Sequence, residues 1–289
     1  MERLTTFDAH AGQVLDLTFT PESDVLISAG MDNMVKLWSV DDWELIATLE
    51  GHEKSVNSLA LSPEGRTLAT GSSDATVGLW SLPNRELLHT LQNRKKTVSA
   101  VAISADGAWV ASGWYGGRAV VWTTDGENVV DIEASGRNLS AVAAGEGRLA
   151  TAGLGDEINV WEIPSGALVA TLSGHETAVN SVHFVASGQR LVSLGYEGTI
   201  RLWDTGTWEQ ERVIDLDDAS ARRLALSTDE GMAALSLEGR IELWNAQTWH
   251  PVDELSLSAK AVGGMAFSPD GAHLAAGAAD GKVRVWVAA

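Results

Sequence analysis

The sequence contains no cysteine. This excludes a disulfide framework, a zinc–thiolate site, an iron–sulfur cluster and a cysteine nucleophile. No apolar run approaches the roughly 18 residues of a membrane-spanning helix, so we expect no membrane insertion. The first eight residues carry no apolar segment of the kind found in a signal peptide. We therefore expect a cytoplasmic protein.

Basic residues are also scarce. Lys and Arg number 20 against 39 Asp and Glu, which gives a formal net charge of −19. Binding to a phosphate backbone needs a basic surface, so this composition disfavours a nucleic-acid partner. Hydrophobic residues make up 45% of the chain and charged residues only 20%, a balance that favours a packed core over disorder. The 29 glycines favour the many turns of an all-β chain.

The aromatic residues are distributed unusually, with 12 Trp against two Tyr and four Phe. Seven of the tryptophans recur at intervals of 39 to 42 residues: Trp38, Trp80, Trp122, Trp161, Trp203, Trp244 and Trp286. Each ends a short run in which apolar and other residues alternate, such as Val35-Lys36-Leu37-Trp38. Such alternation predicts a half-buried β-strand.

The rest of each interval repeats as well. The segment Ser62-Pro63-Glu64-Gly65 has a counterpart in Ser268-Pro269-Asp270-Gly271, and short apolar runs flank both. One interval thus predicts four short antiparallel strands in about 40 residues, the length of one propeller blade. We predict an all-β fold, a seven-bladed β-propeller of four-stranded antiparallel blades, and a single domain over residues 1–289.

The last blade needs a strand from elsewhere in the sequence. The chain stops three residues after Trp286, before a fourth strand of that unit could form. Residues 3–10 align in residue type with residues 45–52, which contain a fourth strand. We therefore predict that residues 1–9 supply the outer strand of blade seven and close the ring, which removes open sheet edges.

These features resemble the WD-repeat β-propeller family over essentially the whole chain. The marks that carry the resemblance are a Gly-His pair whose histidine lies 28 residues before the repeat Trp, an Asp six before it, and a Trp-Asp pair. They occur as Gly51-His52 and Gly174-His175, as Asp32, Asp74 and Asp280, and as Trp203-Asp204.

The resemblance implies that a His, a Ser or Thr, an Asp and the Trp form a hydrogen-bonded chain within a blade. The matching residues are His10, Ser28, Asp32 and Trp38 in blade one; His52, Thr70, Asp74 and Trp80 in blade two; and His175, Ser193 and Trp203 in blade five, with Glu197 in place of Asp. Blade three, with Arg94, Ser112 and Gly116, is predicted to lack the chain. Blade four keeps Thr151 and Trp161 but has no histidine.

Nothing in the sequence marks a catalytic site. The Ser-His-Asp sets recur at blade spacing, so we interpret them as structural networks rather than as triads, which need an accessible nucleophile. Phosphate-binding, dinucleotide-binding, metalloprotease and nucleophile-elbow motifs are all absent. The histidines have no metal-ligand spacing. We therefore predict no enzyme activity, no cofactor and no metal.

The resemblance also implies where partners bind, on the face around the central channel. The matching positions flank the first apolar residue of each blade's first strand or precede the blade Asp. We predict a patch centred on Tyr115, Trp114 and Tyr196, with Arg222 across the channel. Leu154 takes the Tyr115 position in blade four. Further candidates are Met31, Leu237, Leu15, Asn57 and Asn180.

The predicted function is a non-catalytic protein–protein interaction scaffold. It would present a rigid propeller face to protein or peptide partners, as a subunit of a larger assembly. One alternative is a propeller enzyme or small-ligand binder with its site at the channel mouth. Another is a structural subunit that uses its side or lower face. Trp43, Trp208 and Trp249, each five residues after a repeat Trp, would then carry the contacts.

Overall fold

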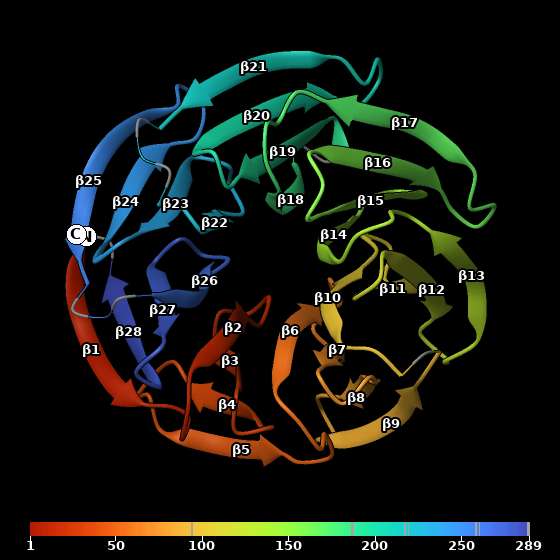
Figure 1. Cartoon of the computed structure of the whole chain (residues 1–289). Helices are drawn as coiled ribbons and strands as arrows, with labels where there is room; N and C mark the ends of the chain where they lie inside the picture. The colour runs from red at the N-terminus through yellow and green to blue at the C-terminus, as the bar shows by residue number, and fades with distance from the viewer. Residues whose placement is uncertain are drawn as a thin grey trace. The chain divides into compact units, whose positions relative to one another are not determined.

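The computed structural model describes residues 1–93, 95–185, 188–216, 218, 220–257, 259 and 261–287. Every regular element in these residues is a β-strand, and the strands form seven four-stranded antiparallel sheets (Figure 1). No helix long and apolar enough to cross a membrane occurs among them. The fold is a seven-bladed β-propeller, as predicted.

Six of the sheets consist of four strands that follow one another in the chain. Blade one is β2–β5 (Val14–Phe19, Val25–Gly30, Val35–Ser39, Leu45–Leu49), blade two β6–β9 (Val56–Leu61, Thr67–Ser72, Val77–Ser81, Glu86–Leu91), blade three β10–β13 (Val98–Ile103, Trp109–Trp114, Arg118–Thr123, Asn128–Glu133), blade four β14–β17 (Leu139–Ala144, Arg148–Gly153, Glu157–Glu162, Leu168–Ser173), blade five β18–β21 (Val179–Val185, Arg190–Gly195, Thr199–Asp204, Gln210–Asp215) and blade six β22–β25 (Arg223–Leu226, Met232–Leu237, Arg240–Asn245, His250–Ser256).

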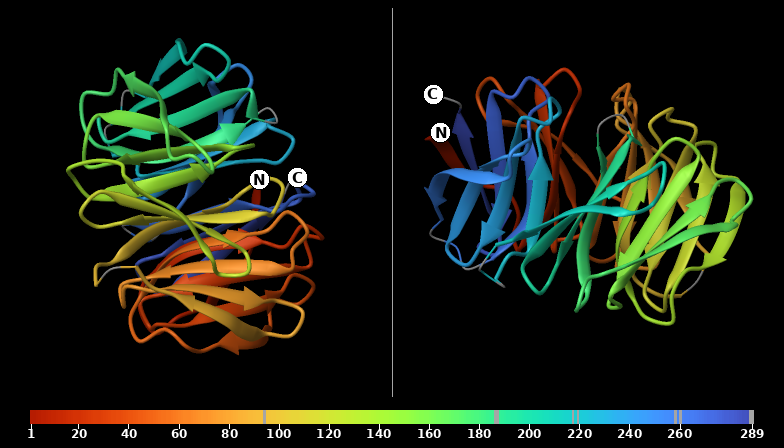
Figure 2. Two further views of the ribbon diagram at one scale, coloured as in Figure 1. Left: turned by 90° about the vertical axis from the view of Figure 1, so that its right-hand side faces the viewer. Right: turned by 90° about the horizontal axis from the view of Figure 1, so that it is seen from above.

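Blade seven combines the two ends of the chain. It contains β26–β28 (Val262–Phe267, His273–Ala278, Lys282–Val287) and, beside β28, the N-terminal strand β1 (Glu2–Asp8). The β1–β28 register pairs Phe7 with Val283 and Asp8 with Lys282. The first and last strands of the chain, β1 and β28, accordingly lie side by side (Figure 2). The predicted completion of blade seven by the N-terminal strand is confirmed.

Burial follows the order of strands within a blade. The second strand is almost wholly buried, as at Leu26 and Ile27 of β3. A strand covered on both faces consists of small and apolar residues without alternation. The fourth strand has few buried residues, and apolar side chains such as Leu45 and Leu168 are exposed there. The repeat tryptophans lie on the third strands and are all buried.

The apolar core lies between successive sheets. One cluster joins Leu79 of blade two to Val98 and Trp122 of blade three. Another joins Leu26 of blade one to Val285 of blade seven. Because each sheet buries apolar side chains against its neighbour in this way, one blade alone could not cover its own faces.

Contacts divide the chain into two compact units. Unit one comprises Met1–Leu59, Pro83–Glu86 and Ala221–Ala289, and unit two comprises Ala60–Leu82 and Leu87–Ser220. Unit one therefore holds blades one, six and seven, and unit two holds blades three, four and five with most of blade two. The prediction of a single domain stays a prediction.

Three tryptophans occupy the same position in the corresponding turns of three blades, as their spacing predicted. Trp43, Trp208 and Trp249 have φ angles of 61°, 59° and 56°, a region that residues other than glycine seldom occupy. Their amides donate to the carbonyls four residues earlier, with N–O distances of 2.9, 2.7 and 2.7 Å. The Trp43 ring packs against Phe7 of β1, with centroids 6.2 Å apart. At least Trp43 therefore serves packing between blades.

Candidate functional site

Blade one contains the complete hydrogen-bonded chain that the resemblance implied. The Trp38 Nε1 donates to Ser28 Oγ at 2.9 Å, and Ser28 Oγ lies 2.7 Å from His10 Nε2. On the other side of the ring, His10 Nδ1 lies 2.7 Å from Asp32 Oδ1. The Ser28 side chain is fully buried. A nucleophile has to reach its substrate, so this triad-like set has a structural role.

The protonation of this network follows from its burial. Burial lowers the pKa of His10 below its ordinary value, although Asp32 opposes the shift. Burial raises the pKa of Asp32, but hydrogen bonds from His10 and from the Ala11 amide outweigh it and leave the pKa lowered. A neutral histidine beside a carboxylate keeps its proton on Nδ1. The hydrogen bonds therefore run from Trp38 to Ser28 to His10 Nε2, and from His10 Nδ1 to Asp32.

Blade five completes the same chain with a longer acid. Trp203 Nε1 donates to Ser193 Oγ at 2.9 Å, Ser193 Oγ lies 2.7 Å from His175 Nε2, and His175 Nδ1 contacts Glu197. Hydroxyls of Thr177 and Thr199 also donate to the Glu197 carboxylate. Burial opposes ionisation of Glu197, but the bonds from His175, Thr177 and Thr199 prevail and lower its pKa to about 2. Sequence spacing located Glu197 but not the two threonines.

Blades two and seven contain parts of this hydrogen-bonded chain. In blade two, Trp80 Nε1 donates to Thr70 Oγ1 at 2.9 Å. His52 and Asp74, the other residues implied there, are both partly buried. In blade seven, Asp280 pairs with the buried guanidinium of Arg284 at 2.6 Å. The repeat Asp can therefore be held by a cation instead of a histidine.

In blade three, Trp114 has a structural role in the hydrogen-bonded network. The sequence placed it in the partner patch, but it is the last residue of β11 and is 0% exposed. Its Nε1 donates to Ser112 Oγ at 2.9 Å, and the repeat residue Trp122 donates to the same oxygen at 3.2 Å. Trp114 thus provides a hydrogen-bond partner where other blades use histidine. Arg94, the residue at the histidine position, lies outside the described residues.

Two further predicted contact residues are also buried. Leu237 is the last residue of β23 and pairs with Arg240, so its side chain stays in the sheet instead of entering a turn. Asn180 lies in β18 and is buried as well. Together with Trp114, these residues belong to the interior, and the prediction that they form part of a contact surface is wrong.

Unit two exposes a set of apolar side chains at equivalent turns of three consecutive blades. Tyr115, Leu154 and Tyr196 are 45%, 49% and 38% exposed. Each follows the second strand of its blade. Their amides donate to the carbonyls of Thr97, Asn138 and Ala178, each at 2.9 Å. The backbone is therefore fixed while the side chain faces solvent. We refer to Tyr115, Leu154 and Tyr196 as the turn set.

In unit one, Met31 and Ala279 are exposed at the same position, and Met31 is the larger side chain. Met31 is 52% exposed, and its amide donates to Gln13 O at 2.9 Å. Arg222 is exposed, and its Nη1 donates to the carbonyl of Ala221. Leu15 and Asn57 are only partly buried. That Met31, Arg222, Leu15 and Asn57 contact a partner stays a prediction.

Comparison with known protein families identifies the repeats. The model of the WD domain, G-beta repeat, matches residues 1–39, 43–81, 85–123, 166–204 and 249–287, more than half of the chain. The chain belongs to the WD-repeat family. The matches leave out residues 124–165 and 205–248, which contain the first three strands of blades four and six.

Several curated proteins resemble short segments of this WD-repeat chain. They include a CCR4-associated factor 4 homolog of Candida glabrata, 31% identical over 28% of this chain. A periodic tryptophan protein 2 homolog of Schizosaccharomyces pombe is 42% identical over 20% of it, and a guanine nucleotide-binding protein subunit beta-5b of Danio rerio is 41% identical over 20%. The similar segments span 13%, 7% and 15% of those proteins.

Proposed function

We propose that this WD-repeat protein is a non-catalytic interaction scaffold and that the turn set of unit two contacts a protein or peptide partner. The observation that carries the proposal is the exposure of Tyr115, Leu154 and Tyr196 at equivalent, backbone-fixed turns. Rigid exposed aromatic and apolar side chains are typical of interface centres. Little conformational entropy is lost when such side chains are covered, since the backbone is already ordered.

The relatives support a role within an assembly. One is named as a subunit and another as an associated factor. Both names describe proteins that act together with others. For this chain we infer the same kind of role, with a partner whose identity is open. The cytoplasmic location that the sequence suggested stays a prediction.

The test is affinity capture from the native source with the wild-type chain and a Tyr115→Ala, Leu154→Ala, Tyr196→Ala variant. The exposed side chains contribute little to stability, so the variant should unfold at nearly the same urea concentration as wild type. A partner enriched on wild type should be reduced at least tenfold on the variant. Purified partner and protein then give the change in Kd.

A matched control uses exposed apolar residues elsewhere in unit two. Leu168 and Val169 of β17 are exposed on the fourth strand of blade four, and their double alanine variant should capture the partner normally. Capture that is unchanged in the turn-set variant would refute the proposal. Capture lost only in the Leu168→Ala, Val169→Ala variant would instead favour the structural subunit that binds through its side.

A further inference from the structure

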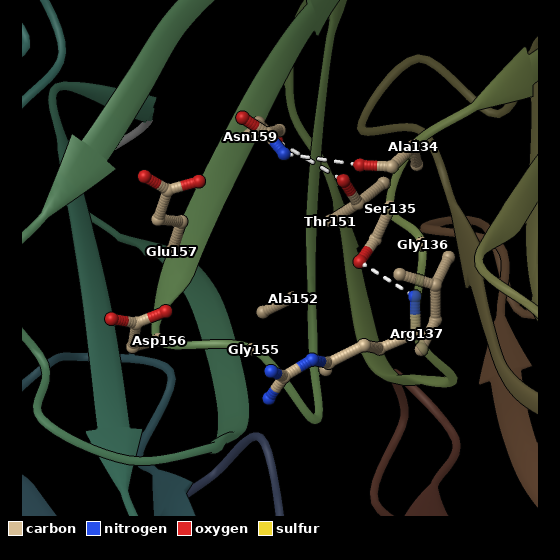
Figure 3. A pocket seen from close by; sticks show the side chains of 12 residues that line it. Ala134, Ser135, Gly136, Arg137, Thr151, Ala152, Gly155, Asp156, Glu157 and Asn159 are labelled. Carbon is tan, nitrogen blue, oxygen red and sulfur yellow. Dashed lines mark hydrogen bonds between the residues drawn. The ribbon is translucent and has the colours of Figure 1, made fainter.

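Blade four contains a pocket of about 330 Å³ that lies wholly within unit two. Figure 3 shows residues that line it, which come from the segment entering blade four, from the second and third strands of that blade and from the turn between those strands. Among them are Ser135, Arg137, Thr151, Asp156 and Asn159. The pocket therefore belongs to one blade and involves none of the three turn-set side chains.

Backbone hydrogen bonds show which position Ser135 occupies. In blade one, the amides of Ala9 and His10 both donate to Gly281 O, at 2.9 and 3.0 Å. In blade four, the amides of Ala134 and Ser135 both donate to Gly117 O, each at 2.9 Å. Ser135 thus takes the place of the network histidine.

Blade four also lacks the acidic residue of the network, the counterpart of Asp32. Gly155 follows Leu154 as Asp32 follows Met31, and the amides of Leu154 and Met31 make the same kind of bond. A Cβ placed on Gly155 would meet no atom within 4 Å. The pocket is therefore the space that an imidazole and a carboxylate fill in blade one.

The rest of the network is still in place around this space. Trp161 Nε1 donates to Thr151 Oγ1 at 2.9 Å, as Trp38 does to Ser28. The Thr151 hydroxyl donates to Asn159 O over a long 3.3 Å. Its counterpart in blade one, Ser28, is 2.7 Å from a histidine nitrogen.

Polar groups surround the open side of the pocket. The carboxylates of Asp156 and Glu157 lie along one edge, and Arg137 extends toward Gly155 and Asp156 (Figure 3). Two bonds fix the walls, from Arg137 Nη1 to Leu154 O at 2.9 Å and from Asn159 Nδ2 to Ala134 O at 3.0 Å.

We propose that this pocket binds an imidazole ring. One ring nitrogen accepts the hydrogen bond of the Thr151 hydroxyl, and the opposite N–H donates to the carboxylate of Asp156 or Glu157. This arrangement reproduces the network of blade one, with the ring supplied from outside the chain. The pocket has room for a substituent on the ring, so the ring can belong to a small molecule or to the histidine of a peptide. The inference does not depend on the proposed scaffold function, because the turn-set side chains take no part in it.

The test is an NMR titration of ¹⁵N-labelled protein with imidazole at about pH 8, where the ring is neutral. The indole N–H signal of Trp161 should shift and saturate, because that group donates to the oxygen that the ligand contacts. A five-atom ligand is expected to bind with a millimolar Kd. 1-Methylimidazole, which has no N–H, should bind at least tenfold more weakly. A Gly-His-Gly peptide that binds tighter than imidazole would identify a peptide histidine as the source, and weaker binding would identify a small molecule.

Two variants decide whether the ligand occupies this pocket. Ser135→His fills it with the protein's own ring, and Thr151→Val removes the hydroxyl while keeping the side-chain shape. Each should weaken imidazole binding at least tenfold. Ser165→His, on an exposed turn of the same blade, should bind as wild type does. If Ser135→His does not fold, Thr151→Val decides alone. Unchanged affinity in a folded pocket variant, or no saturable Trp161 shift in wild type, would overturn the proposal.

Discussion

The indole nitrogen of Trp114 lies 2.9 Å from the hydroxyl oxygen of Ser112, two positions earlier on the same strand. Blades one and five place a histidine nitrogen next to the equivalent serine. In blade three the serine hydroxyl donates to Val120 O and accepts from two indoles. Blade three therefore keeps a satisfied buried hydroxyl although its acid position is glycine.

Removing the Trp114 donor should destabilise the protein. Trp114→Phe keeps most of the buried apolar surface but loses one buried hydrogen bond, which contributes about 1–2 kcal/mol. Urea denaturation should show that decrease in unfolding free energy, with partner capture intact. Tyr115→Phe, at the neighbouring exposed position, should change stability by less than about 0.5 kcal/mol. If the variant has normal stability but no longer captures the partner, Trp114 takes part in partner binding after all.

The parts of the fold that the sequence could predict depend on repetition. Phased tryptophans gave the number of blades, and the alignment of residues 3–10 with 45–52 gave the strand that completes blade seven. A regular spacing also located Glu197, because a longer acid at the repeat position still reaches His175. Each of these features has the same offset in several units.

Features particular to one blade could not be predicted in this way. Trp114 was misplaced because it ends β11 at the position that Gly30 takes in β3, where its side chain is buried in the core. Leu237 was misplaced because β23 continues one residue further than β3 does, so Leu237 pairs with Arg240 and is buried, whereas Met31 lies beyond its strand. The pocket of blade four arises where Ser135 and Gly155 carry too few atoms to fill the blade. The sequence showed that blade four has no network histidine, but not that the space of that side chain stays open.

The contact of Phe7 with two tryptophans predicts how much the side chains of β1 contribute to stability. Its ring lies 4.7 Å from Trp38 and 6.2 Å from Trp43, measured between centroids. Phe7→Ala should lower the unfolding free energy by about 1–3 kcal/mol, since the ring is partly buried. Leu4→Ala, an exposed position on the same strand, should have a negligible effect. Equal effects of the two substitutions in urea denaturation would show that β1 contributes only backbone pairing.

Gly281 accepts both amides that begin blade one's network, and it cannot take a side chain. Its φ is +77°, and a Cβ there would lie 2.4 Å from His10 O. Gly281→Ala should therefore lower the unfolding free energy by about 1–2 kcal/mol, because a residue with a side chain is strained in the left-handed region. The decrease should be larger still, because the His10 carbonyl has to move. Gly271 has a similar φ of +70° with open space around it, so Gly271→Ala should show only the decrease that comes from this strain. Thermal denaturation of both variants measures the difference.

Acid should destabilise the protein in two steps. Burial holds the pKa of His10 and His175 below 6.5, so the unfolded chain takes up more protons as the pH falls through 6.5, and stability drops. The pKa of Glu197 is lowered from 4.5 to about 2. Its contribution is therefore present above pH 4.5 and is lost between there and about pH 2. Urea denaturation at a series of pH values should show both decreases.

The second step can be assigned to Glu197 with one variant. Glu197→Gln has no carboxylate to protonate, so its stability should fall less than that of wild type between pH 4.5 and about 2. Its stability near pH 7 should be lower, because His175 and the two threonines lose a charged acceptor. Identical pH profiles below 4.5 would show that other carboxylates, such as Asp32, account for the loss.

Rebuilding the network in blade four should stabilise it. The double variant Ser135→His, Gly155→Asp places an imidazole next to Thr151 and a carboxylate where a Cβ meets only open space. Each new hydrogen bond contributes about 1 kcal/mol, part of which is offset by fixing two side chains. We expect unfolding free energy to rise by about 1 kcal/mol, and imidazole to lose its site. Ser165→His alone should change neither quantity. A double variant less stable than wild type would show that the walls of the pocket, held by Arg137 and Asn159, cannot accommodate the ring that blade one contains.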